Sequence, residues 1–301
     1  MTNVIKAEVA LDCAHGLGES ALWDARRQLF RWVDIPTGTL HSLDLGSGEH
    51  RSTVLDDLIS NVVLAEDGTL VVANRREVYR YDEASGERQV LWTVDEGGST
   101  RLNDGAADPA GRLLIGTLAY DNVSAVGGLY SLDHSDTGGS RQRRLLPGVT
   151  TSNGLGWTVD GSRFYHVDSP TRLLRSYDYD VETGDISYRG VLAEIKIGDA
   201  VPDGLIVDGD DCVWVALWGG AAVHRYTPAG VLDTVVDVGA TYVTSCAFAG
   251  SDRDTLVITT ARDSGDPGTA PDAHGGALFA VRPGVAAQAE RVVSLPGARH
   301  R

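Results

Sequence analysis

The sequence predicts an all-β protein built as a six-bladed β-propeller, and three observations predict it. Short runs rich in Val, Leu, Tyr and Trp, such as Val78–Asp82 and Val213–Trp218, are bounded by Gly, Asp or Asn, which is typical of strands and turns. Turn signals recur six times, at spacings of about 43 to 50 residues, close to the length of a four-stranded blade. Helical periodicity is almost absent. The repeat therefore favours a ring of six equivalent units.

Each unit contains the same succession of elements. A hairpin turn is followed by an apolar strand, a short turn and a strand with aromatic character. The hairpin turns are expected at Trp23–Ala25, Glu66–Gly68, Asp108–Gly111, Val159–Gly161, Gly209–Asp211 and Ser251–Arg253. The strands with aromatic character read LHSLDL, VYRYDE, LYSLDH, LRSYDYD, VHRYTP and LFAVRP. A stacked sandwich or two smaller β domains would not require six equivalent units, whereas a closed ring does and leaves few exposed edges.

Composition limits the class of protein further. The 301 residues include 36 glycines and 10 prolines, which favours many tight turns, and we expect residues 1–301 to form one domain because no linker interrupts them. A net charge of −16 argues against nucleic acid or an anionic membrane as partner. The three cysteines show no CxxC spacing. Without a recognisable signal sequence, the expected location is the cytoplasm. Monomer and small homo-oligomer both stay open.

A polar residue comes four to eight positions before each hairpin turn. In a propeller the first strand of every blade lines the central channel, so these residues should converge at one face of the ring. They are Glu19, Asn61, Asn103 with Asp104, Asn153, Asp203 and Ser245. The glycines of the Asn-Gly and Asp-Gly pairs are expected to adopt positive φ there. In RLNDGAADPAGR (101–112) the first turn signal would then form the channel rim and the second the hairpin.

Three of these residues supply only oxygen donors. Glu19, Asn153 and Asp203 offer two carboxylates and one amide carbonyl, a set that suits a hard divalent cation such as Ca²⁺, Mg²⁺ or Mn²⁺. Three protein ligands would leave positions open for water and substrate, as a catalytic metal requires. Any one of them alone could form an ordinary Asx turn, but several at the same place in the repeat favour a shared site.

Nine motifs give the chain a resemblance to a known family. LGESALWD, RLNDGAADPAGRLLIGT, SNGLGW, PDGLIVD and five further strings, spread from about Gly16 to Gly284, resemble the gluconolactonase family, which includes senescence marker protein/regucalcin. The resemblance implies a six-bladed propeller that binds one divalent metal and hydrolyses sugar lactones. Ca²⁺ is the leading expectation, with Zn²⁺, Mn²⁺, Mg²⁺ and Fe²⁺ as alternatives.

The resemblance also implies roles for single residues. Glu19, Asn153 and Asp203 match the family's metal ligands, and Asp203 matches the proposed general base. Arg101 and Asn103 match residues that contact the sugar. The chain departs from the family at Ala21, at Leu118 and at Phe248-Ala249-Gly250, and Leu118 with the loop 119–127 is expected to alter the lid of the pocket and hence the substrate. Asn61 is less typical, and is either an added polar contact or a residue that starts a strand.

Other chemistries fit the sequence less well. No Gly-x-Ser-x-Gly elbow is present, and Cys246 is expected to belong to the core rather than to act as a nucleophile. Two alternatives stay open. The first is a promiscuous esterase or organophosphate hydrolase that uses the same site. The second is a non-catalytic calcium-binding propeller, against which the Arg101 and Asn103 pair argues, because calcium storage needs no sugar contacts.

Overall fold

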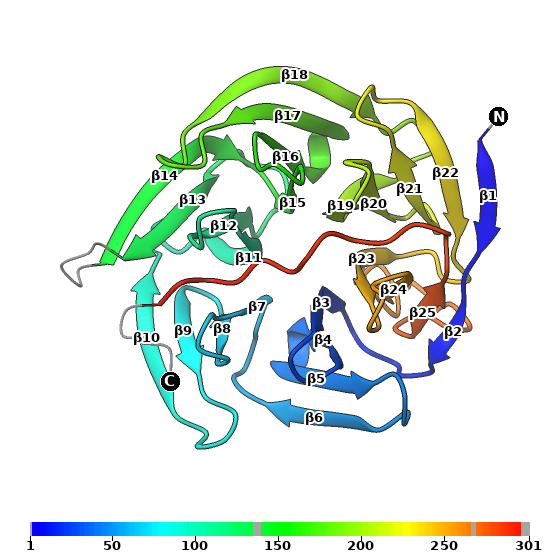
Figure 1. The fold of residues 1–301 in the computed structure, drawn as a ribbon, viewed down its shortest axis with the longest axis horizontal. Coiled ribbons are helices and arrows are strands. Elements are labelled where there is room, and N and C mark those ends of the chain that lie inside the picture. Colours follow the sequence, from blue (N-terminus) through cyan, green and yellow to red (C-terminus); the bar gives the residue numbers. More distant parts are fainter. Residues whose placement is uncertain (1, 95, 135–139, 266–268, 296–301) are drawn as a thin grey trace.

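A computed structural model describes residues 2–94, 96–134, 140–265 and 269–295. Within these residues six sheets, antiparallel except for one added parallel strand, surround a central channel (Figure 1), which confirms the six-bladed propeller. All six hairpins predicted between the first two strands of a blade are present, because each turn sequence lies between two apolar runs that bury the same core.

The blades follow one another along the chain, and each starts with the strand nearest the channel. Blade 1 contains β3 (Gly18–Asp24), β4 (Leu29–Asp34), β5 (Thr39–Asp44) and β6 (His50–Val54). Blade 2 contains β7 (Asn61–Leu64), β8 (Leu70–Ala73), β9 (Glu77–Tyr81) and β10 (Arg88–Thr93). Blade 3 contains β11 (Thr100–Ala107), β12 (Leu113–Ala119), β13 (Gly127–His134) and β14 (Ser140–Val149).

Blades 4 to 6 repeat the pattern. Blade 4 contains β15 (Ser152–Trp157), β16 (Arg163–Asp168), β17 (Leu173–Tyr179) and β18 (Ile186–Glu194). Blade 5 contains β19 (Val201–Val207), β20 (Val213–Trp218), β21 (Ala222–Tyr226) and β22 (Leu232–Asp237). Blade 6 contains β23 (Val243–Ala249), β24 (Thr255–Thr260) and β25 (Leu278–Val281). Short 3₁₀ turns, η1 (Ile35–Thr37) and η2 (Ser169–Thr171), follow β4 and β16.

The N-terminal residues close the ring. Strand β2 (Glu8–Leu11) pairs antiparallel with β25 and completes blade 6, while β1 (Asn3–Lys6) pairs parallel with β22 and adds a fifth strand to blade 5. The first and last parts of the propeller are therefore joined by backbone hydrogen bonds. In blade 6, β2 thereby covers the outer edge of β25, which would otherwise be unpaired.

The core lies between neighbouring blades. In one cluster Trp23, Phe30 and Trp32 of blade 1 pack with Ala247 and Val257 of blade 6, and both Phe30 and Trp32 are fully buried. Similar clusters fill the other contacts between blades. Apolar packing between radial sheets thus fixes how the inner strands stand around the channel.

A C-terminal segment crosses the channel mouth at the hairpin end of the inner strands (Figure 1, red). We call residues 286–294 the strap. Its backbone or side chains bond to five blades, through the following partners: Arg253 of blade 6, Val207 and Gly209 of blade 5, Trp157 and Thr158 of blade 4, Gly111 of blade 3, and Leu64 and Glu66 of blade 2. The strap therefore covers the mouth opposite the starts of the inner strands.

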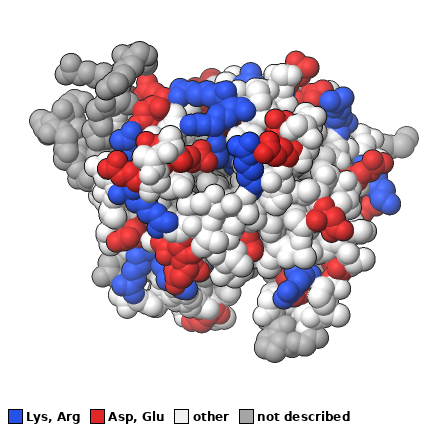
Figure 2. Space-filling view, turned by 90° about the horizontal axis from the view of Figure 1, so that it is seen from below, with Lys and Arg blue, Asp and Glu red and all other residues white. Residues whose placement is uncertain are grey.

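The charged surface is mixed in sign. On the face seen in Figure 2, acidic and basic side chains are interspersed over the molecule rather than gathered in one basic patch. No helix among the described residues is both long enough and apolar enough to cross a membrane.

Candidate active site at the channel mouth

The predicted polar residues occupy one level of the channel. Glu19, Asn61, Asn103 with Asp104, Asn153, Asp203 and Ser245 all lie within the first five residues of the six inner strands. Asn103, Asn153 and Asp203 are buried, while Glu19 and Arg101 are half-buried. The structure thus places the sequence-predicted site residues on separate blades that face one another across the channel.

Irregularities in the pairing of the first two strands of a blade determine where these side chains point. In five of the six blades, as far as the structure describes them, the register between the first and second strands shifts at the site residue. The shifts fall between Glu19 and Leu22, Leu102 and Gly105, Asn153 and Leu155, Pro202 and Leu205, and Val243 and Ser245. A bulge of this kind turns a side chain away from the regular alternation of a strand. Blade 2 differs, because Asn61 pairs with Ala73 in continuous register with the residues that follow.

The expected role of the glycines was wrong. Gly105, Gly154 and Gly204 lie inside strands, and none of them has positive φ, so Asn103-Asp104-Gly105 forms a bulge within β11 rather than a turn. Glycine is required at these positions because the neighbouring strand leaves no room for a Cβ atom. A Cβ on Gly154 would lie 2.7 Å from the Asp203 carbonyl oxygen, and one on Gly204 would lie 2.9 Å from that of Thr244. The glycines let neighbouring inner strands approach closely enough for the site residues to meet.

A chain of hydrogen bonds joins blades 3 and 4. Asn103 Nδ2 donates to Asn153 Oδ1 at 2.8 Å and to the Ser152 carbonyl at 2.9 Å. Arg101 Nη1 donates to Asn103 Oδ1 at 2.8 Å. Asn153 Nδ2 donates to Ser169 Oγ at 2.9 Å, which fixes its amide so that Oδ1 faces Asn103. The expected sugar-contact residues and one expected metal ligand therefore form one network.

Three carboxylates share this level of the channel. Burial, and then the charge of Asp104, raise the pKa of Glu19 to about 8. Burial, with the charges of Glu19 and Asp104, raises the pKa of Asp203 well above its ordinary range, and burial raises that of Asp104 to about 6. Arg101 provides the nearby positive charge, and burial lowers its pKa. The cluster is short of positive charge, which a bound cation would supply.

The donor set fits a divalent cation. Asp203 Oδ1 is buried and has no hydrogen-bond partner among the described residues, although buried carboxylate oxygens normally have one. Carboxylate and amide oxygens are the ligands that Ca²⁺ prefers. Within the described residues no three His, Cys, Asp or Glu side chains form a group that could hold a metal ion. The expected set of Glu19, Asn153 and Asp203 contains only two such residues.

Asn61 fits both interpretations that the sequence left open, because it starts β7 and adds polar contacts, one of them to Asp104, which the sequence placed at the rim without a role. Asn61 Nδ2 donates to Ser20 Oγ at 3.2 Å, to the Gly105 carbonyl at 3.0 Å and to Asp104 Oδ1 at 3.3 Å, so it ties blades 1, 2 and 3 together. Asp104 also accepts from the Gly105 backbone N–H at 2.8 Å. The signal that could have found Asp104 is the extra acidic residue between Asn103 and Gly105, where the fourth blade has Asn-Gly alone.

The loop 119–127 lies beside the site. Leu118 is the cross-strand partner of Arg101, so the two side chains are neighbours. Tyr120 is 50% exposed, and the interaction with its hydroxyl raises the pKa of the Arg75 guanidinium. Asp121 accepts from the backbone N–H groups of Val123 and Ser124 at 2.9 Å, which orders the loop. These contacts form a rim on the blade 3 side of the channel mouth.

Cys246 belongs to the apolar core, where it lies in one cluster with Trp214 and Phe248. Its side chain is 2% exposed, and burial raises its pKa to about 12. A thiol in that state is a poor nucleophile, because the thiolate is the reactive form. The interpretation of Cys246 as a core residue agrees with this placement.

The fold and site define a class of protein: a six-bladed propeller with an acidic, oxygen-lined site at one channel mouth. The family model described as SMP-30/Gluconolactonase/LRE-like region matches residues 17–262. The chain therefore belongs to this family, and the expectation of an enzyme that hydrolyses carboxylic ester bonds is confirmed at the level of the family.

Individual relatives agree with the family assignment. The chain is 37% identical over 257 residues to pentonolactonase XacC of Haloferax volcanii, which covers 85% of each protein. It is 32% identical over 287 residues to human regucalcin, covering 92% of this chain and 94% of that one. A solved structure of a calcium-binding regucalcin from Agrobacterium tumefaciens superposes with a TM-score of 0.89 at 24% identity, over 98% of this chain and all of the other, and shows the same fold.

Proposed function

We propose that the protein hydrolyses a sugar lactone, an aldono-1,4- or 1,5-lactone, to the aldonic acid with one divalent metal ion, most simply Ca²⁺. The observation that carries the proposal is the buried Asp203 Oδ1, which has no hydrogen-bond partner in the part of the chain that the structure describes and lies within a group of carboxylates short of positive charge. Glu19, Asn153 and Asp203 would hold the ion. The names of the relatives support a lactone as substrate.

The metal would supply one function when bound, the stabilisation of negative charge that develops on the lactone carbonyl oxygen. The protein's own residues do the rest. Asp203 takes a proton from the attacking water, while the water oxygen bonds to the carbonyl carbon. The bond from that carbon to the ring oxygen then breaks, and the ring oxygen leaves as an alcohol by taking up the proton that Asp203 had accepted.

Arg101 and Asn103 would position the sugar. Both are held by the hydrogen bonds described above, so the remaining donors of Arg101 are oriented before the substrate arrives. Both amide N–H groups of Asn103 are engaged, so Asn103 would offer its Oδ1 as an acceptor for a sugar hydroxyl. Leu118 and Tyr120 lie at the rim, where they would limit which substituents on the lactone ring can enter. We further propose that residues 1–301 act as one domain in the cytoplasm.

A lactone screen tests the proposal. Metal-stripped protein would be assayed in a pH-stat against five- and six-membered aldonolactones and an aryl phosphotriester, with single divalent ions restored one at a time. We expect lactone hydrolysis that chelator abolishes and one or more ions restore. Hydrolysis of the phosphotriester alone would favour the organophosphate alternative. Calcium binding without any hydrolysis would favour the non-catalytic alternative.

A further inference from the structure

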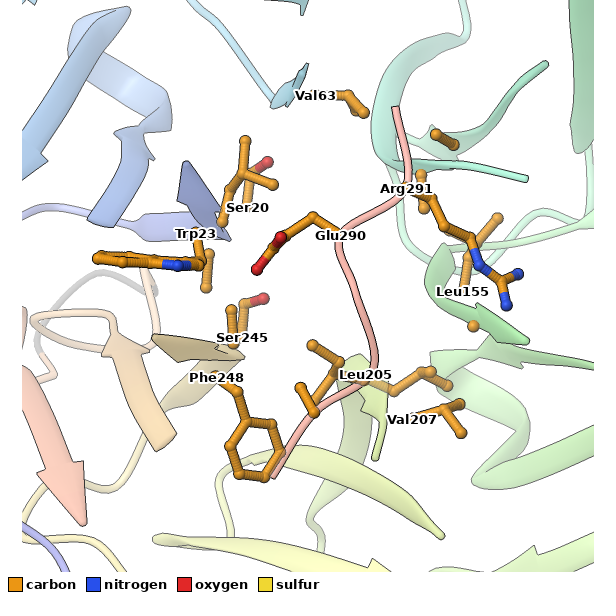
Figure 3. A pocket seen from close by; sticks show the side chains of 18 of the residues that line it. Ser20, Trp23, Val63, Leu155, Leu205, Val207, Ser245, Phe248, Glu290 and Arg291 are labelled. Carbon is orange, nitrogen blue, oxygen red and sulfur yellow. The ribbon is translucent and has the colours of Figure 1, made fainter. Parts of the chain in front are cut away.

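A cavity of about 170 Å³ lies in the channel between the candidate active site and the strap. All six inner strands line it, from Ser20–Trp23 in β3 to Ser245–Phe248 in β23, and residues 287–291 of the strap line its outer end. Figure 3 shows the walls, where Leu155, Leu205 and other apolar side chains predominate. An apolar cavity with a few polar groups is a typical binding site for a small molecule.

One carboxylate projects into this cavity from the strap. Figure 3 shows Glu290 directed inward, toward the side lined by Ser20, Trp23 and Ser245. Its ion-pair partner among the described residues is Arg253, whose Nη1 lies 3.4 Å from Glu290 Oε2. Burial raises the pKa of Glu290, and the nearby charge of Asp24 raises it further. The ion pair with Arg253 therefore offsets only part of the cost of burying the negative charge of Glu290.

The neighbouring cation does not neutralise it. Arg291 Nη2 donates to the Thr158 carbonyl at 2.8 Å and to Gln288 Oε1 at 2.9 Å, and the guanidinium lies over the Trp157 ring. Figure 3 shows Arg291 extending from the opposite side of the strap to Glu290. At the inner end of the cavity the charged lining residue is another carboxylate, Asp104. Arg291 also lines the cavity, and its Nη1 is buried without a hydrogen-bond partner among the described residues. Two carboxylates, Asp104 and Glu290, thus stand against one guanidinium in the lining, an excess of negative charge.

We propose that this cavity is a second binding site, for a small organic ammonium ion with an apolar body. Glu290 would accept hydrogen bonds from the ammonium group, and apolar side chains of the lining such as Leu155 and Leu205 would contact its alkyl chain. The apolar walls would bury the rest of the ligand. The site is at the opposite mouth of the channel from the lactone site and does not depend on the proposed function.

The test uses two probes of equal size, n-butylammonium and 1-butanol, on the full-length protein saturated with Ca²⁺. Binding is measured by isothermal titration calorimetry and by saturation-transfer NMR at fixed ionic strength. Glu290→Gln should raise the Kd of n-butylammonium about ten-fold or more, because a hydrogen bond to a charged group is lost. The Kd of 1-butanol should stay unchanged, since its apolar contacts stay. Lactone hydrolysis should also stay unchanged.

Two controls make the outcome decisive. Asp252→Asn removes an exposed carboxylate from the hairpin that carries Arg253, and should leave n-butylammonium binding as it is if the effect is local. Glu19→Gln changes the active site at the other end. If n-butylammonium does not bind at millimolar concentration, or if its affinity depends on Glu19 and not on Glu290, the proposal is overturned.

Discussion

Asn103 Nδ2 lies 2.8 Å from Asn153 Oδ1, so an expected sugar-contact residue of blade 3 is hydrogen-bonded to an expected metal ligand of blade 4. The two functions that the family resemblance assigns to separate residues are therefore coupled in space. Four predictions follow from this geometry and from the carboxylates around it.

The first prediction concerns Asn103 itself. From the sequence alone, Asn103→Ala should raise KM or lower kcat without releasing metal. The hydrogen bond to Asn153 replaces the last part of this prediction: Ca²⁺ affinity should fall by about ten-fold or more, because groups that orient a metal ligand contribute to affinity. Calorimetric titration with Ca²⁺, together with kinetics at saturating Ca²⁺, separates the two effects. Unchanged Ca²⁺ affinity would show that the Asn103–Asn153 contact does not orient the ligand.

The second prediction concerns Asp203. Asp203→Ala and Asp203→Asn should each lower kcat/KM by about 10³-fold or more, since both variants lose the general base and the Ala variant loses the oxygen ligand as well. The fold should survive. The metal-free Asn variant should melt at or above the temperature of the wild type, because the substitution removes one of three mutually repelling buried carboxylates. Circular dichroism melting in chelator measures this. A folded, fully active variant, or a strongly lowered Tm, would contradict the assignment.

The third prediction is the pH dependence of the metal-free protein. The pKa of Glu19 is raised from 4.5 to about 8, so the folded state binds its proton more tightly than the unfolded state. The stability that Glu19 contributes is fully present below pH 4.5 and is lost as the pH rises through 8. In chelator, the wild type should lose stability relative to Glu19→Gln as the pH rises from about 5 to about 8. This range covers most of the interval between the unfolded and folded pKa values of Glu19.

Urea denaturation of both proteins at several pH values provides the measurement. Added Ca²⁺ should reverse the trend, because it binds the ionised carboxylates and stabilises the folded state by mass action. Parallel pH curves for the wild type and Glu19→Gln in chelator would mean that Glu19 does not titrate in this window.

The fourth prediction concerns Gly154. A Cβ there would meet the Asp203 carbonyl oxygen at 2.7 Å and Leu205 Cγ at 2.9 Å, and the backbone atom cannot rotate away. Gly154→Ala should therefore cost about 1–3 kcal/mol of unfolding free energy and displace Asp203, with a loss of activity. Gly48→Ala is the matched control, because Gly48 has a φ of 76° but open space around it. It should cost about 1 kcal/mol and leave activity unchanged. Equal activity losses would refute the argument from close approach.

The sequence by itself determined the repeat, the strands and the six hairpins. Alternating apolar residues and turn residues such as Asp108–Gly111 act over a few neighbours, so their effect can be read locally. The sequence also placed Glu19, Asn153 and Asp203 at equivalent points of the repeat. The resemblance added their roles, which stay predictions.

Only the tertiary structure decided which residues meet. Asn103 and Asn153 are 50 residues apart in the chain, and their contact depends on how two sheets pack. The same holds for the charges of Asp104 and Glu19 on Asp203, for β2 closing blade 6, and for the strap carrying Glu290 to the channel. Long-range packing of the blades, rather than local pattern, sets these distances. For the same reason the need for glycine at position 154 became visible only with the neighbouring strand in place.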